Sequence, residues 1–460
     1  MRVEAQFDQS LVQKYNRSGP RYTSYPTALE FHPGFGEAQY RQAAELSNTT
    51  GKPLSLYFHI PFCDTLCYYC GCNKIITHNE TRKENYVDTL VQEIALHGPL
   101  YDRKRVVQQL HWGGGTPTSI SHDAMRRIIG AAREHFHMLD GDQGEYSVEV
   151  DPRGVSAETV QVLRSLGFNR MSLGVQDFEP EVQRAVNRLQ SVEETRSVIE
   201  AARATGFRSI NVDLIYGLPL QTRASFARTL DVVLGLKPDR LAIFNYAHLP
   251  ARFKSQKLID TAQLPPPEVK LAMVEDTNRR LAEAGYLLVG MDHYALADDE
   301  LVHAQIAGTL YRNFQGYSTH ADCDMVGMGV TAISMVGRSY SQNSKDTKQY
   351  SDAIRAGHIP VHAGYELTED DIIRREVITQ IMCNFELNFA RMGQRLGLNF
   401  SDYFAADLPR LQELASDGLF ELTSTDLRVQ PRGVPLIRHV AMALDAHLHK
   451  QDVNRYSKVI

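Results

Sequence analysis

The chain has 460 residues, a formal net charge of −6, 43% hydrophobic residues and 23% charged residues, which is ordinary for a globular protein. Its length predicts two or three domains at roughly 150 residues each, and its interspersed charges exclude a general nucleic-acid binder. No apolar run approaches the roughly 18 residues of a membrane span, and Met1–Leu11 is too polar for a signal peptide. We therefore expect a soluble, cytoplasmic protein with neither nucleic acid nor membrane as a partner.

Residues 1–52 are predicted to form an arm and a leading segment ahead of the first strand. Lys14–Thr27 contains Gly19, Pro20 and Pro26 and shows neither helical nor strand periodicity. A disordered tail is the alternative, but several aromatic and arginine side chains within this short stretch argue against it. The segment is therefore predicted to be extended and to lie on the rest of the protein.

Residues 53–300 repeat one pattern, a short apolar run followed by a longer helical stretch. Alternating strands and helices predict βαβ units and a parallel sheet. The predicted strands are Leu54–Ile60, Gln109–Gly113, Tyr146–Val150, Arg170–Val175, Ser209–Leu214, Arg240–Tyr246 and Tyr286–Met291. The predicted helices include Asp123–His137, Ala157–Leu166, Val192–Thr205 and Ala224–Leu234. Periodicity alone leaves open whether the sheet is a doubly wound layer or a barrel.

The pattern changes in the last third of the chain. Residues 301–367 are predicted to extend the α/β domain and connect it to the carboxyl-terminal region, and residues 368–460 to form a small, mostly helical, winged-helix-like domain. Its predicted elements are helices at Asp370–Asn384 and Leu408–Asp417, a hairpin at Leu419–Gln430 and a helix at Arg432–Leu448. Winged helices often bind DNA, but fold does not decide function, and we interpret this domain as a packing or lid module.

Six cysteines are too few for a disulfide scaffold in a chain of this length. Cys323 and Cys383 stand alone and are expected to be buried as small apolar side chains. The other four fall within ten residues, directly after the first predicted strand: Cys63, Cys67, Cys70 and Cys72.

Thiolates are soft ligands for iron–sulfur clusters, zinc or copper(I). If Cys63, Cys67 and Cys70 hold three irons of a cubane cluster, the fourth iron stays open to a small chelating ligand. The alternative is a structural zinc ion enclosed by all four cysteines. Structural zinc usually joins two distant segments, whereas these cysteines share one loop, which favours the cluster.

The spacing C-x3-C-x2-C on the loop after the first strand resembles the signature of the radical S-adenosylmethionine (SAM) superfamily. In that superfamily the open iron binds the amino and carboxylate groups of SAM, and an electron from the cluster releases a 5′-deoxyadenosyl radical. The resemblance implies an α/β fold, a partial (β/α)6-type parallel barrel, and two cofactors, a [4Fe-4S] cluster and SAM.

Further segments are similar to the oxygen-independent coproporphyrinogen III oxidase branch, and the resemblance spans essentially the whole chain. These segments are His59–Cys63, His111–Thr118, Ser147–Arg153, Leu173–Phe178, Val186–Arg188, Asn211–Pro219 and Phe314–Ser318. The family converts two propionates of coproporphyrinogen III into vinyl groups, giving protoporphyrinogen IX in haem biosynthesis. It implies that the radical removes a hydrogen beside the ring, that carbon dioxide leaves, and that an electron passes to an unidentified acceptor. It also implies a monomer and a reducing electron donor such as flavodoxin or ferredoxin.

The resemblance assigns eleven residues to SAM: Tyr57, Tyr69, Gly114, Gly115, Thr116, Glu149, Gln176, Arg188, Asp213, Ala247 and Ile333. Six of these would also serve a second SAM molecule: Tyr69, Gly115, Thr116, Gln176, Arg188 and Asp213. Without the resemblance, the glycines predict a tight turn and the two apolar residues predict core positions. Glu149 and Asp213 end strands where βα loops gather, which favours ligand binding over a structural role.

Four more residues are candidates for catalysis or substrate binding. His59 either makes a hydrogen bond behind the ligand or simply packs. Cys72 is expected to act near the substrate, since a fourth thiolate would close the cluster. Arg17 and Arg21, on the arm, are expected to bind propionates because arginine forks suit carboxylates, the alternative being that both are solvated.

Three competing functions remain open at this level. A haem-binding chaperone of the same superfamily would lack the extra cysteine and the long arm, so Cys72 and Arg21–Pro26 favour the oxidase. A simple electron-transfer iron–sulfur protein would not need the large barrel. Gly327–Ala332 approximates a dinucleotide fingerprint but lacks a predicted strand–turn–helix, so we do not expect nicotinamide binding.

Overall fold

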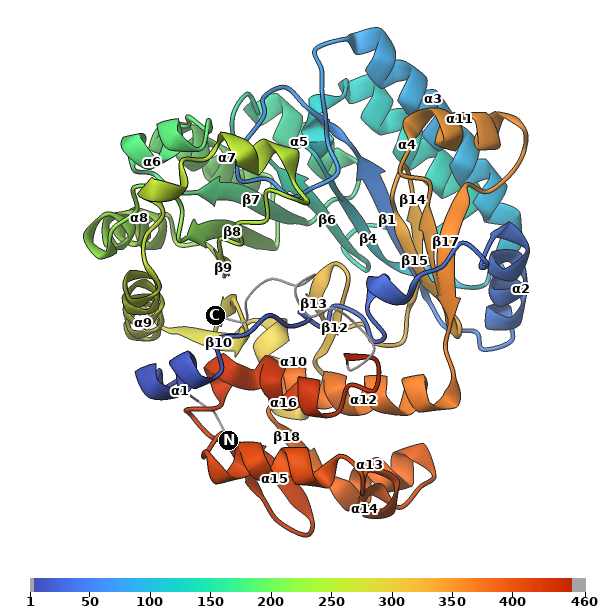
Figure 1. The fold of residues 1–460 in the computed structure, drawn as a ribbon. Helices are drawn as coiled ribbons and strands as arrows, with labels where there is room; N and C mark the ends of the chain where they lie inside the picture. The colour runs from blue at the N-terminus through green and yellow to red at the C-terminus, as the bar shows by residue number, and fades with distance from the viewer. Residues whose placement is uncertain (1–3, 449–460) are drawn as a thin grey trace.

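Six parallel strands form the centre of a curved sheet, as the (β/α)6-type prediction requires (Figure 1). The computed structural model describes residues 4–448, so the ends of the predicted arm (1–3) and carboxyl-terminal domain (449–460) lie outside it. In sheet order the parallel strands are β1 (Leu54–Ile60), β4 (Val106–Gly114), β6 (Glu145–Val150), β7 (Arg170–Gln176), β8 (Ser209–Tyr216) and β9 (Arg240–Asn245).

Helices cover the outer face of this sheet. They are α3 (Glu80–His97), α4 (His122–His135), α5 (Ala157–Ser165), α6 (Pro180–Ala185), α7 (Val192–Ala204), α8 (Arg223–Leu236) and α9 (Pro267–Glu283). Side-chain oxygens of Ser121, Ser156 and Ser191 cap the amino ends of α4, α5 and α7. Local capping together with apolar periodicity explains why sequence alone placed these three helices within two residues.

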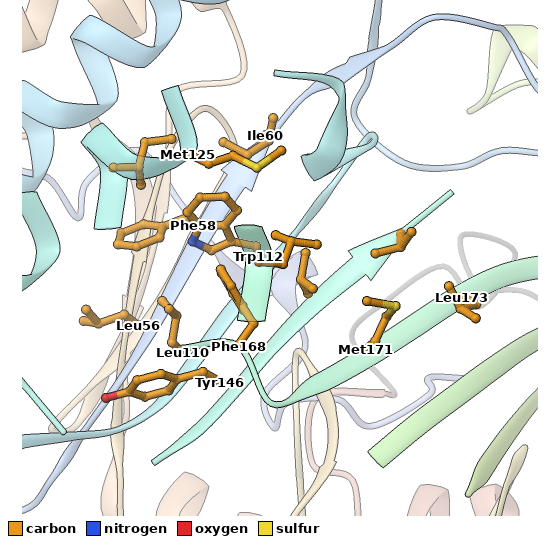
Figure 2. Close-up of a cluster of buried hydrophobic side chains, with 14 of the residues drawn as sticks. Leu56, Phe58, Ile60, Leu110, Trp112, Met125, Tyr146, Phe168, Met171 and Leu173 are labelled. Atoms are coloured by element: carbon orange, nitrogen blue, oxygen red, sulfur yellow. The ribbon is translucent and has the colours of Figure 1, made fainter. Parts of the chain in front are cut away.

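Side chains along the parallel strands alternate between an apolar core and the interior of the curved sheet. Figure 2 shows the outward set, which packs under the helices and includes Leu56, Phe58, Leu110 and Trp112. Each such buried side chain contributes roughly 1.5–3 kcal/mol. The intervening positions carry polar side chains that face inward. The two-residue period of a strand therefore sorts core residues from candidate site residues.

The strand predicted at Tyr286–Met291 is present, but it does not join the sheet as a seventh neighbour in the parallel series. That segment forms β10 (Tyr286–Gly290), which pairs antiparallel with β11 (His293–Leu296), and β11 pairs antiparallel with β9. Only Met291 and Asp292 connect β10 to β11, which is far too short for a parallel crossover. The barrel therefore remains partial and ends in a hairpin.

The other edge of the sheet is built from residues 324–366. β14 (Asp324–Met328) pairs parallel with β1, and three antiparallel strands follow: β15 (Ile333–Val336), β16 (Ser339–Asn343) and β17 (Val361–Glu366). A strand, not a helix, follows the glycines of β14, so Gly327–Ala332 lacks the strand–turn–helix of a dinucleotide site. The flanking helices are α2 (Glu37–Asn48) and α11 (Thr347–Arg355). Cys323 and Cys383 are both buried, as predicted.

Short elements complete the α/β part. The β2 (Phe62–Cys63) and β3 (Ile75–Ile76) pair flanks the cysteine loop, and β5 (His137–Met138) pairs with β4. α10 (Glu300–Ala307) leads into a hairpin of β12 (Tyr311–Asn313) and β13 (Gly316–Ser318), which lies at the centre of Figure 1. Among the described residues, no helix combines the length and apolar character needed to cross a bilayer.

The carboxyl-terminal part is mostly helical, as predicted. It comprises α12 (Glu369–Asn384), α13 (Phe389–Leu396), α14 (Phe400–Tyr403), α15 (Leu408–Ser416) and α16 (Ile437–Ala443), with a sheet of β18 (Glu386–Asn388), β20 (Asp426–Val429) and β19 (Phe420–Leu422). The predicted hairpin is β19–β20. The predicted helix Arg432–Leu448 is too long, because Pro435 lies in a 3-10 turn ahead of α16.

The amino-terminal arm is ordered between the two parts (Figure 1). After α1 (Gln9–Lys14) it runs extended, and its Leu11, Tyr15, Tyr22 and Tyr25 join the core of the carboxyl-terminal part. Arg438 of α16 donates hydrogen bonds to the carbonyls of Gly19 and Pro20. The extended arm is thus confirmed over the disordered tail.

The carboxylate of Glu93 joins α3 to the β14–β16 edge, and its removal is expected to destabilise the fold. It is fully buried and accepts hydrogen bonds from Gly329 N (2.7 Å), Asn343 Nδ2 (2.7 Å) and Tyr350 Oη (2.6 Å). Glu93→Gln replaces one carboxylate oxygen with an NH2 group, which cannot accept the hydrogen bonds that Glu93 receives. The free energy of unfolding should therefore fall by about 1–3 kcal/mol. In urea titrations the exposed control Glu45→Gln should stay within about 0.5 kcal/mol, and equal stabilities of the two variants would contradict this account.

Candidate active site

The cysteine loop between β2 and β3 is fixed along its length by hydrogen bonds to its backbone. Tyr68 N donates to Val186 O (3.0 Å), and Asn187 Nδ2 donates to Leu66 O (2.8 Å). Gln256 Nε2 donates to Tyr69 O (2.9 Å). These partners come from the segments after β7 and β9, so the loop is held above the carboxyl ends of the parallel strands.

The three spaced cysteines each lie near a hydrogen-bond donor. Thr116 Oγ1 lies 3.5 Å from Cys63 Sγ, and Arg188 Nη1 lies 3.5 Å from Cys67 Sγ. The backbone N of Cys72 lies 3.4 Å from Cys70 Sγ. Donors and cations next to sulfur favour thiolates, the form that binds metal. Three soft ligands on one rigid loop therefore fit an iron–sulfur cluster.

The thiols differ in acidity because their surroundings differ. A hydrogen bond from the Cys72 side chain, assisted by Lys74, lowers the pKa of Cys70 to about 6. Burial raises the pKa of Cys63 to about 11. The pKa of Cys72 is raised well above its usual value by the same hydrogen bond to Cys70 and by the charge there. In this arrangement Cys72 is the proton donor and Cys70 the anion, so the fourth cysteine differs chemically from the other three.

The glycine run after β4 fits closely against the start of the cysteine loop. Gly115 N donates to Ile60 O (2.8 Å) and Thr116 N to Phe62 O (2.7 Å). A Cβ on Gly114, whose φ is +123°, would lie 2.8 Å from Ile60 O, and a Cβ on Gly115 would lie 2.7 Å from Phe62 O. Glycine is required here because backbone meets backbone.

A polar cavity of about 220 Å³ lies inside the curved sheet and contains both predicted acids. Glu149 accepts from His111 Nε2 (3.2 Å) and Gly114 N (3.1 Å), while Asp213 accepts from Ser172 Oγ (3.0 Å) and Asn211 Nδ2 (2.7 Å). The structure thus brings the two carboxylates to one cavity below the cysteine loop.

The two acids ionise differently. Burial and the negative charge of Glu149 raise the pKa of Asp213 to about 6. Burial acts in the same direction on Glu149, but hydrogen bonds from His111 and Gly114 outweigh it and leave the pKa of Glu149 below its usual value. Near neutral pH, Glu149 is a carboxylate and Asp213 is close to its titration point.

Tyr57 and His59 connect the end of β1 to the loop that carries Cys72. Tyr57 Oη lies 3.0 Å from His59 Nδ1, and His59 Nε2 lies 3.1 Å from Asn73 O. Burial lowers the pKa of His59, so the ring is neutral, with its proton on Nε2 towards the carbonyl. The Tyr57 ring stacks on His111 with centroids 5.8 Å apart. Two sequence-predicted residues therefore lie beside the cavity.

Gln176 ends β7, and Arg188 follows α6; both side chains lie close to Gly174 of β7. Arg188 is buried and pairs with Asp151 (2.9 Å) in addition to its contact with Cys67, and its other nitrogen donates to Gly174 O. Gln176 has a φ of +70°, which bends the strand end and brings its amide over Gly174.

Ala247 and Ile333 come from opposite sides of the sheet, the first from the segment after β9 and the second from β15. Gln256 Nε2 donates to Ala247 O (3.1 Å) as well as to the cysteine loop. Ile333 begins β15 and abuts Gly327, which is the register partner of Tyr57. Tyr69 packs in an apolar cluster with Val186 and its neighbours.

The two arm arginines are placed differently. Arg21 forms an ion pair with Asp292 in the β10–β11 turn, and its guanidinium carbon lies 5.9 Å from the ring centroid of Phe244, which lines the cavity. Arg17 is exposed. The structure therefore brings Arg21, and not Arg17, to the cavity wall.

Sequence reasoning missed four residues of this site: His111, Asp151, Arg153 and Gln256. His111 lies two residues before Gly113 on β4, so strand alternation could have placed it inside. Asp151 and Arg153 continue the alternation of Glu149, and Arg153 Nη2 lies 3.7 Å from Cys67 Sγ. No sequence signal marks Gln256.

Comparison with known proteins agrees with this geometry. Residues 57–233 match the model of the radical SAM superfamily, and residues 367–436 match the HemN C-terminal domain. The chain is 50% identical over 99% of both chains to an oxygen-independent coproporphyrinogen III oxidase of Pseudomonas aeruginosa. It is 49% identical to the protein of that name from Escherichia coli, over 99% of this chain and 98% of the relative.

A solved structure supports the same relationship. Coproporphyrinogen III oxidase (HemN) from Escherichia coli, described as a radical SAM enzyme, superposes with a TM-score of 0.91 and 47% identity over 97% of this chain and all of that chain. The similarity covers the arm, the barrel and the carboxyl-terminal part together. The protein therefore belongs to the oxygen-independent coproporphyrinogen III oxidase family of the radical SAM superfamily.

Proposed function

We propose that the protein decarboxylates two propionate side chains of coproporphyrinogen III to vinyl groups, yielding protoporphyrinogen IX in oxygen-independent haem biosynthesis. The observation that carries the proposal is the three-cysteine loop, held over a polar cavity, in a chain half identical to enzymes of that name along its whole length. The relatives at 49–50% identity carry the oxidase name, which favours this function over a haem chaperone.

The cofactors of this family are a [4Fe-4S] cluster and SAM, and we assign the cluster to Cys63, Cys67 and Cys70. When bound, they supply a 5′-deoxyadenosyl radical that can remove hydrogen from a substrate carbon. Arg188 and Thr116 would orient two of the thiolates through the contacts described above. Cys72 would stay outside the coordination shell, since a fourth thiolate would close the iron that has to remain open to SAM.

Glu149 and Asp213 are well placed to accept hydrogen bonds from the ribose hydroxyls of SAM, because both line the cavity below the cluster loop. The remaining SAM contacts that we propose are Tyr57, Tyr69, Gly114, Gly115, Thr116, Gln176, Arg188, Ala247 and Ile333. Tyr69, Gly115, Thr116, Gln176, Arg188 and Asp213 are also our candidates for a second SAM. His59 would hold Tyr57 and the Cys72 segment in place through its two hydrogen bonds.

The same proposal extends to the environment and partners of the site. Enclosure by the barrel and the arm would protect a primary radical from water. The electron donor would be a small reduced protein such as flavodoxin or ferredoxin, and the enzyme would act as a monomer. We retain the division into 1–52, 53–300, 301–367 and 368–460 as a proposal for its domains.

The direct test is anaerobic incubation of the reconstituted protein with reductant, SAM and coproporphyrinogen III. Mass spectrometry should show loss of two carbon dioxide units together with 5′-deoxyadenosine. Cys63→Ser should bind little iron and form neither product, because a cluster ligand is missing, whereas the buried control Cys323→Ser should form both. Cleavage of SAM with an intact tetrapyrrole would keep the superfamily and reject the substrate.

The pKa of Asp213 predicts how SAM binding depends on pH. If its carboxylate accepts from ribose, affinity should fall about fourfold between pH 7.5 and 5.5, because roughly three quarters of a group with a pKa of about 6 is protonated at pH 5.5. Glu149 stays ionised throughout because its pKa is lowered. Calorimetric titration of Asp213→Asn with SAM should give a weaker affinity that no longer varies with pH, and a pH-independent wild type would exclude this role.

The arm arginines are expected to bind substrate propionates. Arg17→Ala/Arg21→Ala should raise the KM for coproporphyrinogen III about tenfold, since a charged hydrogen bond contributes about 1.5–3 kcal/mol. The single variants should show the effect in Arg21→Ala, the residue at the cavity wall. Arg41→Ala, which removes a surface ion pair with Glu37, is the matched control. Unchanged substrate affinity of the double variant would remove both residues from the site.

A further inference from the structure

Positive charge accumulates where the β12–β13 hairpin, the β10–β11 turn, the arm and α16 meet. Arg21, Arg312 and Arg438 each interact electrostatically with the carboxylate of Asp292. His293 adds no charge, because burial and the neighbouring Arg312 lower its pKa to about 3. Three guanidinium groups therefore lie close to the same carboxylate within residues 4–448.

The three arginines differ in their hydrogen bonds and ion pairs. Arg21 pairs with Asp292, and Arg438 donates to the carbonyls of Gly19 and Pro20. Arg312 is only 6% exposed, and neither its Nε nor its Nη1 has a hydrogen-bond partner among residues 4–448. Its guanidinium carbon lies 4.7 Å from the ring centroid of Tyr317. A buried guanidinium with two free donors is costly unless an anion joins it.

The neighbouring positive charges change the pKa of Arg438. Burial and the positive charges of Arg21 and Arg312 lower the pKa of this guanidinium to about 9, far below its usual range. A carboxylate next to Arg312 would offset its share of this positive charge. No acidic side chain of the described chain forms an ion pair with Arg312.

Arg312 adjoins the same cavity that contains Glu149 and Asp213. Its strand neighbour Asn313 and its cross-strand partner Tyr317 both line that cavity. Tyr317 contacts His293 edge-on, with centroids 5.1 Å apart, and His293 likewise contacts Phe244 at 5.8 Å. The guanidinium of Arg312 thus lies behind Tyr317, one of the residues that line the cavity, on the side where Asp292 and Arg438 are found.

We propose that Arg312 is a substrate-binding residue that takes one carboxylate of the tetrapyrrole as its missing partner. The inference rests on the proposed function and names the residue that recognises a propionate not undergoing reaction. A carboxylate oxygen can accept a charge-assisted hydrogen bond from either unpartnered nitrogen of Arg312, and the carboxylate would also neutralise its buried charge. Holding a remote propionate here would orient the reacting side chains towards the cysteine loop, so Arg312 would set specificity for substrates with several carboxylates.

The test compares an acid with its neutral counterpart on the reconstituted holoenzyme. Coproporphyrin III and its tetraamide differ only in the carboxyl groups, and quenching of porphyrin fluorescence reports binding of both. Arg312→Gln should weaken binding of the acid about tenfold and binding of the tetraamide less than about twofold. Arg312→Lys, which keeps the charge but not the fork, should fall between wild type and Arg312→Gln. Arg338→Gln, an exposed arginine paired with Glu369, should match the wild type.

Each other outcome overturns the inference in a recognisable way. Equal weakening of acid and tetraamide by Arg312→Gln would mean that the arginine only supports the fold. Weaker SAM binding with unchanged porphyrin binding would mean that the partner is the methionine carboxylate of SAM. If the wild type neither binds coproporphyrin III nor decarboxylates coproporphyrinogen III, the proposed function fails as well. If the wild type is active and Arg312→Gln binds coproporphyrin III as tightly as the wild type does, only the inference about Arg312 is rejected.

Discussion

The alternation of side chains along six parallel strands is the constraint on which the site depends. Leu56, Phe58 and Trp112 are fixed by burial under the helices, and this burial forces Tyr57 and His111 to face inward. A shift of one residue in any strand would exchange core and cavity residues, at the cost of burying histidines and carboxylates against the helices. The hydrophobic core therefore determines which polar groups can meet, and the cysteine loop is added at the end where the glycine run leaves room for it.

The ion pairs near the cysteine loop differ from those around Asp292. At the cysteine end, Arg188 and Arg153 share Asp151 and both direct nitrogens at Cys67. The Cys67 sulfur thus accepts from two cationic side chains, which suits a metal-binding position. Elsewhere, three arginines surround Asp292, and among the described residues Arg312 forms no ion pair. A carboxylate of the tetrapyrrole substrate would complement the arginines near Asp292.

Sequence reasoning succeeded where the signal is local. The six parallel strands, the capped helices and the cysteine spacing each depend on residues within one turn or one strand, so their patterns are readable in the chain. It failed where distant segments decide. The antiparallel β10–β11 hairpin depends on a two-residue turn, and the β14–β17 edge depends on pairing with β1 across more than two hundred residues. Gln256 and Arg312 could not be predicted, because their partners, or the lack of them, arise only when several elements pack together.

The carboxyl-terminal part is best understood through the arm that it holds. Its core contains four arm residues, Leu11, Tyr15, Tyr22 and Tyr25. Arg438 also donates hydrogen bonds to the carbonyls of Gly19 and Pro20 in the arm. Without this support, the arm between α1 and the barrel would have little apolar surface of its own to bury and would be disordered. Because Arg21 reaches Asp292 only from the ordered arm, the helical part indirectly fixes charge at the wall of a cavity that lies in the barrel. The mostly helical carboxyl-terminal part thus packs the arm, and its surface against the arm is accounted for by these contacts.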